Sequence, residues 1–399
     1  IYAKHVNADG FYHTDVGRAL KLLRLHHPDE EYTAKVYGPL RRLLDFYQKD
    51  RDREGMDLYD IRDQFETGQE YTSRYFFADD RADSYGWDHR LRLKGVDVTS
   101  YVYGLSAELL ELAWQQQRVD DIRVLSELQA HIQAAVNAFL WDAERGWYMD
   151  YSAQKKEHSH YVASVGCYPV LFGLAAPQRA LRVGERLGEP AGLWTTWPLA
   201  TVPQDDPYYS ADPDWRGERA NCPWNGRVWP MVNSHVCEVL ERLSELDPEQ
   251  YRPRLASFLR RYIEMLHFEK QDAGSHAGKD LLRPNCFEHY HPEDGTACEY
   301  RGVDDYMHSW VADLILRYVA GVRVTEQRDN VSVRRTILFD PYPFGLDSFI
   351  LNTCLVARHE IEVQWNRDRA GSTLPGYRVY VDNALVHESP EICRFEYAL

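Results

Sequence analysis

The spacing of apolar residues changes once along this chain, and that change constrains the fold more than any other feature. From about residue 15 to residue 320, apolar side chains recur at every third or fourth position, which is the period of an amphipathic helix. Typical runs are Leu105, Leu109 and Leu112, and later Val232, Val236 and Leu240. After about residue 325 the period becomes two, in VSVRRTILFD, SFILN, EIEVQWN and YRVYVDN, which is the period of a strand. The sequence therefore predicts a helical domain over residues 1–324 and a small antiparallel, β-sandwich-like domain over residues 325–399.

Short polar turns join the helical segments in pairs, at QQQRVDD near residue 118 and at SELDPEQ near residue 247. Such turns are typical of antiparallel helical hairpins. Longer loops rich in Gly, Pro, Trp and acidic residues separate the pairs, at 50–96, 141–175, 190–226 and 267–304. Long loops within a compact domain are usually functional. We expect these loops to gather at one end of the hairpins and to form a single cleft there.

Composition narrows the classes of ligand. The formal net charge of −16 repels phosphate backbones and anionic lipids, so we expect neither nucleic acid nor a membrane as a partner. Eleven Trp and 27 Tyr suit the apolar faces and hydroxyl edges of sugars, although core and rim packing explains such rings equally well. The seven cysteines contain no C-x-x-C pair, which indicates isolated buried thiols. A carbohydrate is therefore the expected ligand.

The beginning of the chain has no initiating Met, since it opens at Ile1, and it has no recognisable signal peptide. No apolar run reaches the roughly 18 residues that a membrane-spanning helix needs. We therefore expect the chain to be part of a longer polypeptide with further domains upstream.

The segment DLYDIRDQFETGQEYTSRYF combines acids with interleaved aromatic residues. A solvated acidic loop would carry Lys, Ser or Pro between its charges, so the rings indicate partly desolvated carboxyls. Desolvation raises the pKa of a carboxyl toward the range of a general acid. Glu70 is the candidate acid. Glu66, Tyr71 and Arg74 are candidate substrate-binding residues, and Arg74 could instead bind another carboxylate. The alternative is a cluster of acids at the start of a helix.

A second acidic candidate, Glu288, lies between aromatic residues in CFEHYHPEDG. Its rivals Glu293 and Asp294 belong to PEDG, which reads as an exposed turn, and Glu299 follows shortly after. His289 and His291 alone make a weak case for a metal, because a third ligand at fixed spacing is missing.

Further segments carry candidate substrate-binding residues. ANCPWNGRVWPMVNSH combines rings, an arginine and amides, which together suit a sugar subsite. Its candidates are Trp224, Asn225, Arg227 and Trp229. WTTWPLATVPQDDPYY is similar in character and less specific. In GVDVTSYVYG, Asp97 stands at an expected helix start, where capping would also explain it.

These segments resemble those of a known group of glycosidases. ETGQEYTSRYF is similar to the trehalase signature E-S-G-W-D-F-S-S-R-W and to the motif E-S-G-M-D-N-S-P-R of family 63 glycosidases and mannosylglycerate hydrolases. The match puts Glu66 on the motif's Glu, Arg74 on its closing Arg, and Glu70 on the Asp that acts as general acid. WNGRVWPMVN resembles R-G-P-V-W-P-x-x-N, and FEHYHPEDG resembles E-x-Y-(D/N)-P-x-T-G, whose Glu, here Glu288, is the base. The order of the motifs agrees, and the likeness covers roughly residues 50 to 320.

The resemblance implies a mainly α fold, an (α/α)6 toroid of the six-hairpin type, and hydrolysis with inversion of configuration. Because this chain shows fewer than twelve expected helices, one or two hairpins would precede Ile1 or lie within the long loops. Glu70 is one methylene longer than the Asp of the family motif. In the implied mechanism Glu70 protonates the leaving oxygen while Glu288 activates water, with no metal or organic cofactor. We expect exo action on oligosaccharides or polysaccharide side chains.

Two other functions stay open at the level of sequence. A helical-toroid polysaccharide lyase would use Tyr and His for β-elimination, although the charge of −16 argues against a polyanionic substrate. A non-catalytic carbohydrate-binding protein would use the same rings and acids without turnover.

Overall fold

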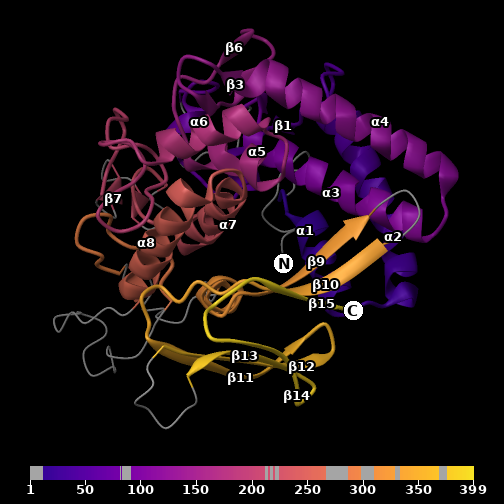
Figure 1. The fold of residues 1–399 in the computed structure, drawn as a ribbon. Coiled ribbons are helices and arrows are strands. Elements are labelled where there is room, and N and C mark those ends of the chain that lie inside the picture. The colour runs from indigo at the N-terminus through magenta and orange to yellow at the C-terminus, as the bar shows by residue number, and fades with distance from the viewer. Residues whose placement is uncertain are drawn as a thin grey trace. The chain divides into compact units, whose positions relative to one another are not determined.

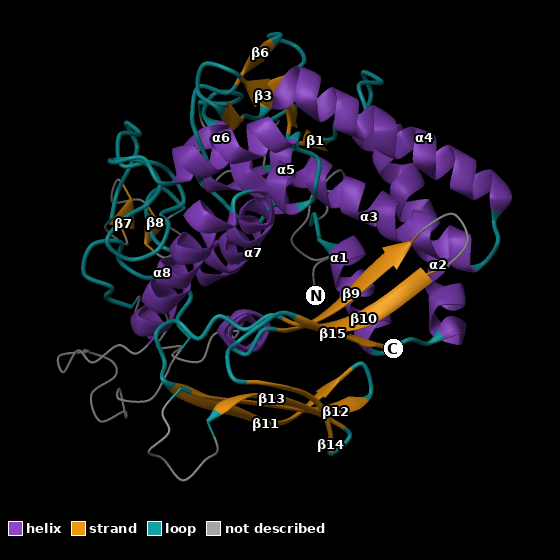
Figure 2. Cartoon of the chain, in the orientation of Figure 1, coloured by secondary structure: helices purple, strands orange, loops and turns teal. Residues whose placement is uncertain are grey.

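The structure is a computed structural model of the 399-residue chain (Figure 1). It describes residues 12–80, 82, 91–211, 214–215, 219–220, 224–266, 286–297, 310–328, 333–367 and 375–399. The chain is mainly helical, with antiparallel sheets toward its C-terminal end (Figure 2). It divides into two compact units, one of residues 1–18 and 34–308, the other of residues 19–33 and 309–399. The predicted domain boundary at 324/325 stays a prediction, since compactness alone does not define a domain.

The helices follow the predicted apolar stripes closely. They are α1 (Val16–His26), α2 (Glu30–Phe46), α3 (Val96–Gln115), α4 (Val119–Ala135), α5 (Tyr168–Leu171), α6 (Pro177–Leu187), α7 (Pro230–Leu246), α8 (Pro248–Leu266) and α9 (Trp310–Leu314). π-helical turns extend α2, α4 and α9 over Tyr47–Arg51, Val136–Leu140 and Ile315–Val319. None of the helices in the described part of the chain combines the length and apolar character that crossing a membrane requires.

Two helical hairpins form as the polar turns predict, α3 with α4 and α7 with α8, and the members of each pair pack side by side (Figure 1). The facing stripes are buried: Leu105, Leu109 and Leu112 in α3 against Leu125, Leu128 and Ile132 in α4. Burying such side chains contributes about 1.5–3 kcal/mol each. In the second hairpin, the Tyr262 hydroxyl donates to the Pro230 carbonyl at 3.0 Å and ties α8 to the first turn of α7. This bond fixes the start of α7, directly after the segment Trp224–Trp229.

The sequence predicts neither the short helix α5, which lies inside the expected loop 141–175, nor the longer helix α6. The buried stripe of α6 consists of Ala180, Val183, Gly184 and Leu187, and the other positions are polar except for Pro177 and Leu181. The helix begins with Pro177 at its first position, where a proline costs no hydrogen bond. This stripe follows the helical period, so the sequence did carry a signal for α6 that the prediction missed.

A four-stranded sheet of very short antiparallel strands connects several loops near the start of α3. Its order is β1 (Asp60–Ile61), β2 (Leu93–Lys94), β5 (Tyr151–Ser152) and β6 (Glu157–His158). Two-stranded ladders join β3 (Trp141–Asp142) to β4 (Trp147–Tyr148) and β7 (Asp214–Trp215) to β8 (Arg219–Ala220). Through the four-stranded sheet, the long loops before α3 and after α4 come together.

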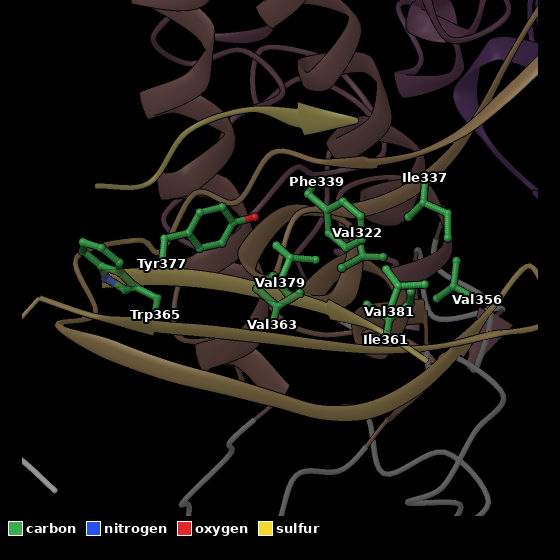
Figure 3. Packing of buried hydrophobic residues seen from close by; sticks show 11 residues of the cluster. Val322, Ile337, Phe339, Val356, Ile361, Val363, Trp365, Tyr377, Val379 and Val381 are labelled. Carbon is green, nitrogen blue, oxygen red and sulfur yellow. The ribbon is translucent and has the colours of Figure 1, made fainter. Parts of the chain in front are cut away.

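The second unit contains two antiparallel sheets that share a core (Figure 3). One has the order β15 (Phe395–Ala398), β10 (Val333–Phe339), β9 (Val322–Arg328), and the other β11 (Ser348–Val356), β12 (His359–Asn366), β13 (Gly376–Val381), β14 (Ala384–Ser389). Alternate residues of β12 enter the core, namely Ile361, Val363 and Trp365, as the period of two requires. The strands expected at β10–β13 are confirmed, whereas β9, β14 and β15 were not singled out.

Residues 19–33 belong to this second unit through polar contacts as well. Arg24 Nη1 donates to Glu326 Oε2 at 2.8 Å, and both side chains are buried. Arg358 Nη2 donates to the Pro28 carbonyl at 2.9 Å. Burial opposes ionisation of Glu326, but Arg24 and Arg335 outweigh it and lower the pKa of that carboxyl.

Candidate functional site

The turn that carries Glu70 has an unusual backbone. Gly68 and Tyr71 both have positive φ, +69° and +66°, and a left-handed tyrosine is costly without support. Both backbone groups of Tyr71 are held: its N–H donates to Gln64 Oε1 at 2.6 Å, and its carbonyl accepts from Asn225 Nδ2 at 2.6 Å. Tyr71 is buried and packs edge-on against Phe65, while Glu70 is half-buried. Glu70 therefore sits in a turn whose shape is fixed from both sides.

Glu66, predicted to bind substrate, is buried, and its oxygens accept hydrogen bonds from protein groups. Arg51 Nη2 donates at 2.7 Å, the Arg62 N–H at 3.0 Å, and His13 Nε2 lies at 3.2 Å. Burial opposes ionisation of this carboxyl, but the hydrogen bond and charge of His13, together with Arg51, outweigh it and lower the pKa of Glu66. The protein groups that pair with Glu66 hold the first residues of the turn in place.

Arg74 is fully buried and binds two carboxylates at once. Its Nη1 and Nη2 donate to Asp97 at 2.9 and 3.0 Å, and its Nε and Nη2 donate to Asp150 at 2.6 and 2.7 Å. This fork geometry is what distinguishes arginine from lysine. Burial opposes ionisation of Asp97, but Arg74 outweighs it and lowers the pKa of that carboxyl.

The same two carboxylates accept hydrogen bonds from the first turn of α3. Asp150 Oδ1 accepts from the Val96 N–H at 2.9 Å, and Asp97 Oδ1 accepts from the Val98 N–H at 2.9 Å. Two N–H groups that have no partner within a helix are thereby satisfied. Asp97 thus acts as a helix-terminus acceptor and as an ion-pair partner of Arg74.

Asp150 and Arg51 were not singled out from the sequence. Asp150 stands alone in YMDY, and Arg51 lies in a stretch where Lys and Arg alternate with Asp. Their partners are remote in the chain, so local spacing carries no signal for either pairing.

Asn225 connects the second motif to the turn of Glu70. Its Oδ1 accepts from the Ser73 N–H at 2.7 Å, while its Nδ2 donates to the Tyr71 carbonyl. Next to it, the indoles of Trp224 and Trp229 are stacked with centroids 3.7 Å apart, and both are almost fully buried. The amide therefore bridges the residues on either side of Thr72.

A ladder of single antiparallel bridges joins the second motif to the third. Val228 and Tyr290 exchange both backbone hydrogen bonds at 2.9 Å, and bridges to Ala200 and Ala297 flank them. Arg227 is buried and donates through Nε to His289 Nδ1 at 3.1 Å and through Nη1 to the Ala211 carbonyl at 2.9 Å. Glu288 is half-buried two residues before Tyr290, and the adjacent Phe287 N–H donates to the Tyr290 hydroxyl at 2.8 Å.

The predicted site residues thus fall into two connected groups. Arg74 and Asp97 meet directly, and Asn225 meets the turn of Glu70 and Tyr71. Arg227 and Trp229 flank Val228 of the ladder, and Glu288 lies two residues before Tyr290, the partner of Val228 in the ladder. Within the described ranges, no set of three or more His, Cys, Asp or Glu side chains is arranged to bind a metal ion.

Comparisons with known proteins agree with the motifs. The family model of the mannosylglycerate hydrolase MGH1-like glycoside hydrolase domain matches residues 11–309. The periplasmic trehalase of Salmonella schwarzengrund (strain CVM19633) is 24% identical over 149 residues, which cover 36% of this chain and 26% of the trehalase.

Solved structures share the fold at low sequence identity. A structure named sialidase has a TM-score of 0.76 at 15% identity, covering 97% of this chain and 33% of that one. The GH63 mannosylglycerate hydrolase of Thermus thermophilus in complex with glucose has a TM-score of 0.58 at 18% identity, covering 78% of this chain and 76% of that one. The chain thus spans about a third or less of the trehalase and of the sialidase it matches.

The family model accounts for most of the first compact unit and includes all three motifs. This chain therefore belongs to the mannosylglycerate hydrolase MGH1-like glycoside hydrolase family, within the group that also holds family 63 glycosidases and trehalases.

Proposed function

We propose that the chain hydrolyses a glycosidic bond with inversion of configuration, with Glu70 as general acid and Glu288 as general base. The observation that carries this proposal is the hydrogen-bonded path through Asn225. That side chain bonds on both sides of Thr72, and three residues later Val228 pairs with Tyr290. The turn of Glu70 and the loop segment that carries Glu288 and Tyr290 are thus tied to one short segment, Asn225–Val228.

The burial of the neighbouring acids supports the choice of Glu70. Glu66 and Asp97 are buried and bound by arginines, so their carboxylates form structural ion pairs inside the protein. Glu70 is half-buried in a turn that the same residues hold rigid. A general acid needs this combination of a fixed position and partial access.

The environment of Glu288 supports the role of base. Its neighbours Phe287 and His289 are almost fully buried, whereas Glu288 itself keeps part of its surface exposed. In the reaction, Glu288 would remove a proton from water as Glu70 protonates the leaving oxygen. The two carboxyls of an inverting site stand about 6.5–9.5 Å apart to leave room for that water.

The remaining predicted residues receive supporting roles in this proposal. Glu66, Arg74 and Asp97 hold the turn of Glu70 from behind, and Asn225 and Arg227 fix the second and third motifs to it. Tyr71, Trp224 and Trp229 are almost fully buried, so in this proposal their rings pack beneath the site and do not contact the sugar. We further propose that the observed hairpins belong to an (α/α)6 toroid and that the enzyme is exo-acting on oligosaccharides or polysaccharide side chains.

The test separates the two roles by the leaving group. The Glu70→Gln variant should lose about 10²–10⁴-fold in rate on alkyl glycosides and disaccharides, because their leaving oxygen needs a proton. It should lose far less on glycosyl fluorides, because fluoride leaves without protonation. Glu288→Gln should lose activity on both substrate types, since both need activated water. The panel includes trehalose and mannosylglycerate, which the names of the relatives suggest.

The matched control is Glu293→Gln, an exposed acid of the same loop that accepts only from Thr196 Oγ1 among the described contacts. It should retain wild-type rates within about twofold. NMR of the first-formed sugar should show the inverted anomer. A retained anomer, or an unsaturated product from β-elimination, would exclude this mechanism, and wild-type chain that binds sugars without turnover would favour a binding protein.

A further inference from the structure

Phe76, Tyr161 and Tyr208 come from three separate loops and form a single cluster of rings. The ring centroids are 4.8 Å apart for Phe76 and Tyr208, 5.5 Å for Tyr161 and Tyr208, and 6.4 Å for Phe76 and Tyr161. Each pair meets edge to face, at 69–79°. All three rings keep part of their surface exposed, whereas the adjacent Tyr75 is fully buried. The cluster therefore presents aromatic surface to solvent beside a ring that is fully buried.

Asp206 connects this cluster to the turn of Glu70 through two hydrogen bonds. Its Oδ2 accepts from the Ser73 hydroxyl at 3.0 Å, and its Oδ1 accepts from the Tyr208 N–H at 2.8 Å. The Ser73 N–H is the group that Asn225 binds. The loop before Tyr161 reaches the same place, because the Ser159 hydroxyl donates to the Arg74 carbonyl at 3.4 Å. Ring cluster and proposed acid are thus held by one continuous set of hydrogen bonds.

The chemistry of the cluster suits one sugar unit. Aromatic rings with exposed surface match the C–H face of a sugar, and a carboxylate beside them matches its hydroxyl edge. Each oxygen of Asp206 has two lone pairs and accepts one protein hydrogen bond in the contacts above, so each can accept another from a hydroxyl. Asp206 is half-buried, which leaves it reachable from outside.

We infer that Phe76, Tyr161, Tyr208 and Asp206 form a subsite for the sugar on the leaving-group side of the cleaved bond. This assignment rests on the proposed function, because Asp206 and the cluster adjoin the turn of the proposed acid, and the acid protonates the leaving oxygen. The subsite selects substrates by their leaving sugar and takes no part in bond cleavage.

The experiment compares two substrates with the same transferred sugar. One is the disaccharide that the wild-type chain cleaves best, and the other is the corresponding glycosyl fluoride, whose leaving group is too small to reach a subsite. The Tyr208→Ala and Tyr161→Ala variants should lower kcat/KM for the disaccharide about tenfold, mainly through KM. The same variants should keep kcat/KM for the fluoride within about twofold. Tyr161→Phe should retain most activity on both, because it keeps the ring.

The control is Phe139→Ala, which removes a partly exposed ring packed on Tyr151 at 5.8 Å, outside this cluster. This substitution should leave kcat/KM unchanged for both the disaccharide and the fluoride. Equal losses on disaccharide and fluoride, or no loss on either, would overturn the subsite. If the wild-type chain cleaves nothing, the proposed function fails by itself. Saturation-transfer NMR with trehalose and mannosylglycerate then decides the subsite, because sugar binding that survives Tyr208→Ala unchanged, or no binding to the wild-type chain, overturns it.

Discussion

At the scale of single residues, buried arginine–carboxylate ion pairs surround the candidate site. Arg74 and Arg51 are both fully buried, and each binds carboxylates that the chain supplies from a distance. A buried ion pair adds little stability over apolar packing, but breaking one is costly because the partner is left uncompensated. We infer that these pairs are kept for the geometry they impose on the turn of Glu70.

The Arg74→Lys variant tests that geometry. Lysine keeps the positive charge but has one ammonium group in place of the planar guanidinium. It therefore cannot make paired hydrogen bonds to Asp97 and Asp150 at the same time. We expect the free energy of unfolding to fall by about 2–4 kcal/mol, measured by urea denaturation. The matched control, Arg123→Lys, alters an exposed pair with Glu127 and should stay within about 0.5 kcal/mol. Equal effects of the two substitutions would contradict the role of the fork.

Glu66 gives a prediction about acid stability. Its folded-state pKa is lowered, so it stabilises the fold above its unfolded pKa of about 4.3, and this contribution disappears as pH falls through the folded pKa. The difference in unfolding free energy between wild type and Glu66→Gln should therefore be largest near neutral pH. Urea denaturation at a series of pH values should show it shrinking below about pH 4.3. A difference that grows toward acid pH would have the wrong sign.

At the scale of elements, one amide side chain connects two loops that lie far apart in the sequence. Asn225 holds the left-handed Tyr71 and the start of the 3₁₀ turn Ser73–Tyr75, so the shape of the Glu70 turn depends on a residue just before α7. The Tyr262 hydroxyl in turn holds the start of α7. The second hairpin thus positions the turn through two hydrogen-bonded steps.

We expect Asn225→Ala to cost about 2–3 kcal/mol in unfolding free energy, since two buried hydrogen bonds are lost. Under the proposed function Asn225→Ala should also lower kcat, because the turn of Glu70 is no longer held by the two hydrogen bonds of Asn225. Asn137→Ala is the control, since Asn137 also makes several hydrogen bonds, to Gln133, Leu174 and Tyr148. It should lose comparable stability but keep kcat. Matching losses of kcat in both variants would show a general structural effect.

The elements differed in how well the sequence could predict them. Helices α3, α4, α7 and α8 were predictable because each repeats its apolar stripe over several turns. The strands β10–β13 were predictable from alternation, whereas β14 follows β13 through Asp382 and Asn383, both at positive φ, in a turn too tight to stand out. The three motifs predicted the candidate site, whereas the pairing of Asp150 with Arg74 was not predictable because the two residues are 76 positions apart in the sequence.

At the scale of the whole molecule, the family assignment covers residues 11–309, and the proposed chemistry lies within the first compact unit. The second unit has its own two-sheet core, with Val322, Ile337 and Phe339 packed against Ile361 and Val363 (Figure 3). The apolar residues of its strands recur at every second position, whereas those of the helices in the first unit recur at every third or fourth. This difference explains the single change in apolar spacing along the sequence.

The composition of the second unit has a consequence for biosynthesis. Residues 19–33 leave the ribosome well before their partners, because Glu326 lies 302 residues after Arg24 and Arg358 lies 330 residues after Pro28. Domains generally fold in the order in which they emerge. Residues 19–33 can therefore make these two contacts only after more than 300 further residues have been synthesised.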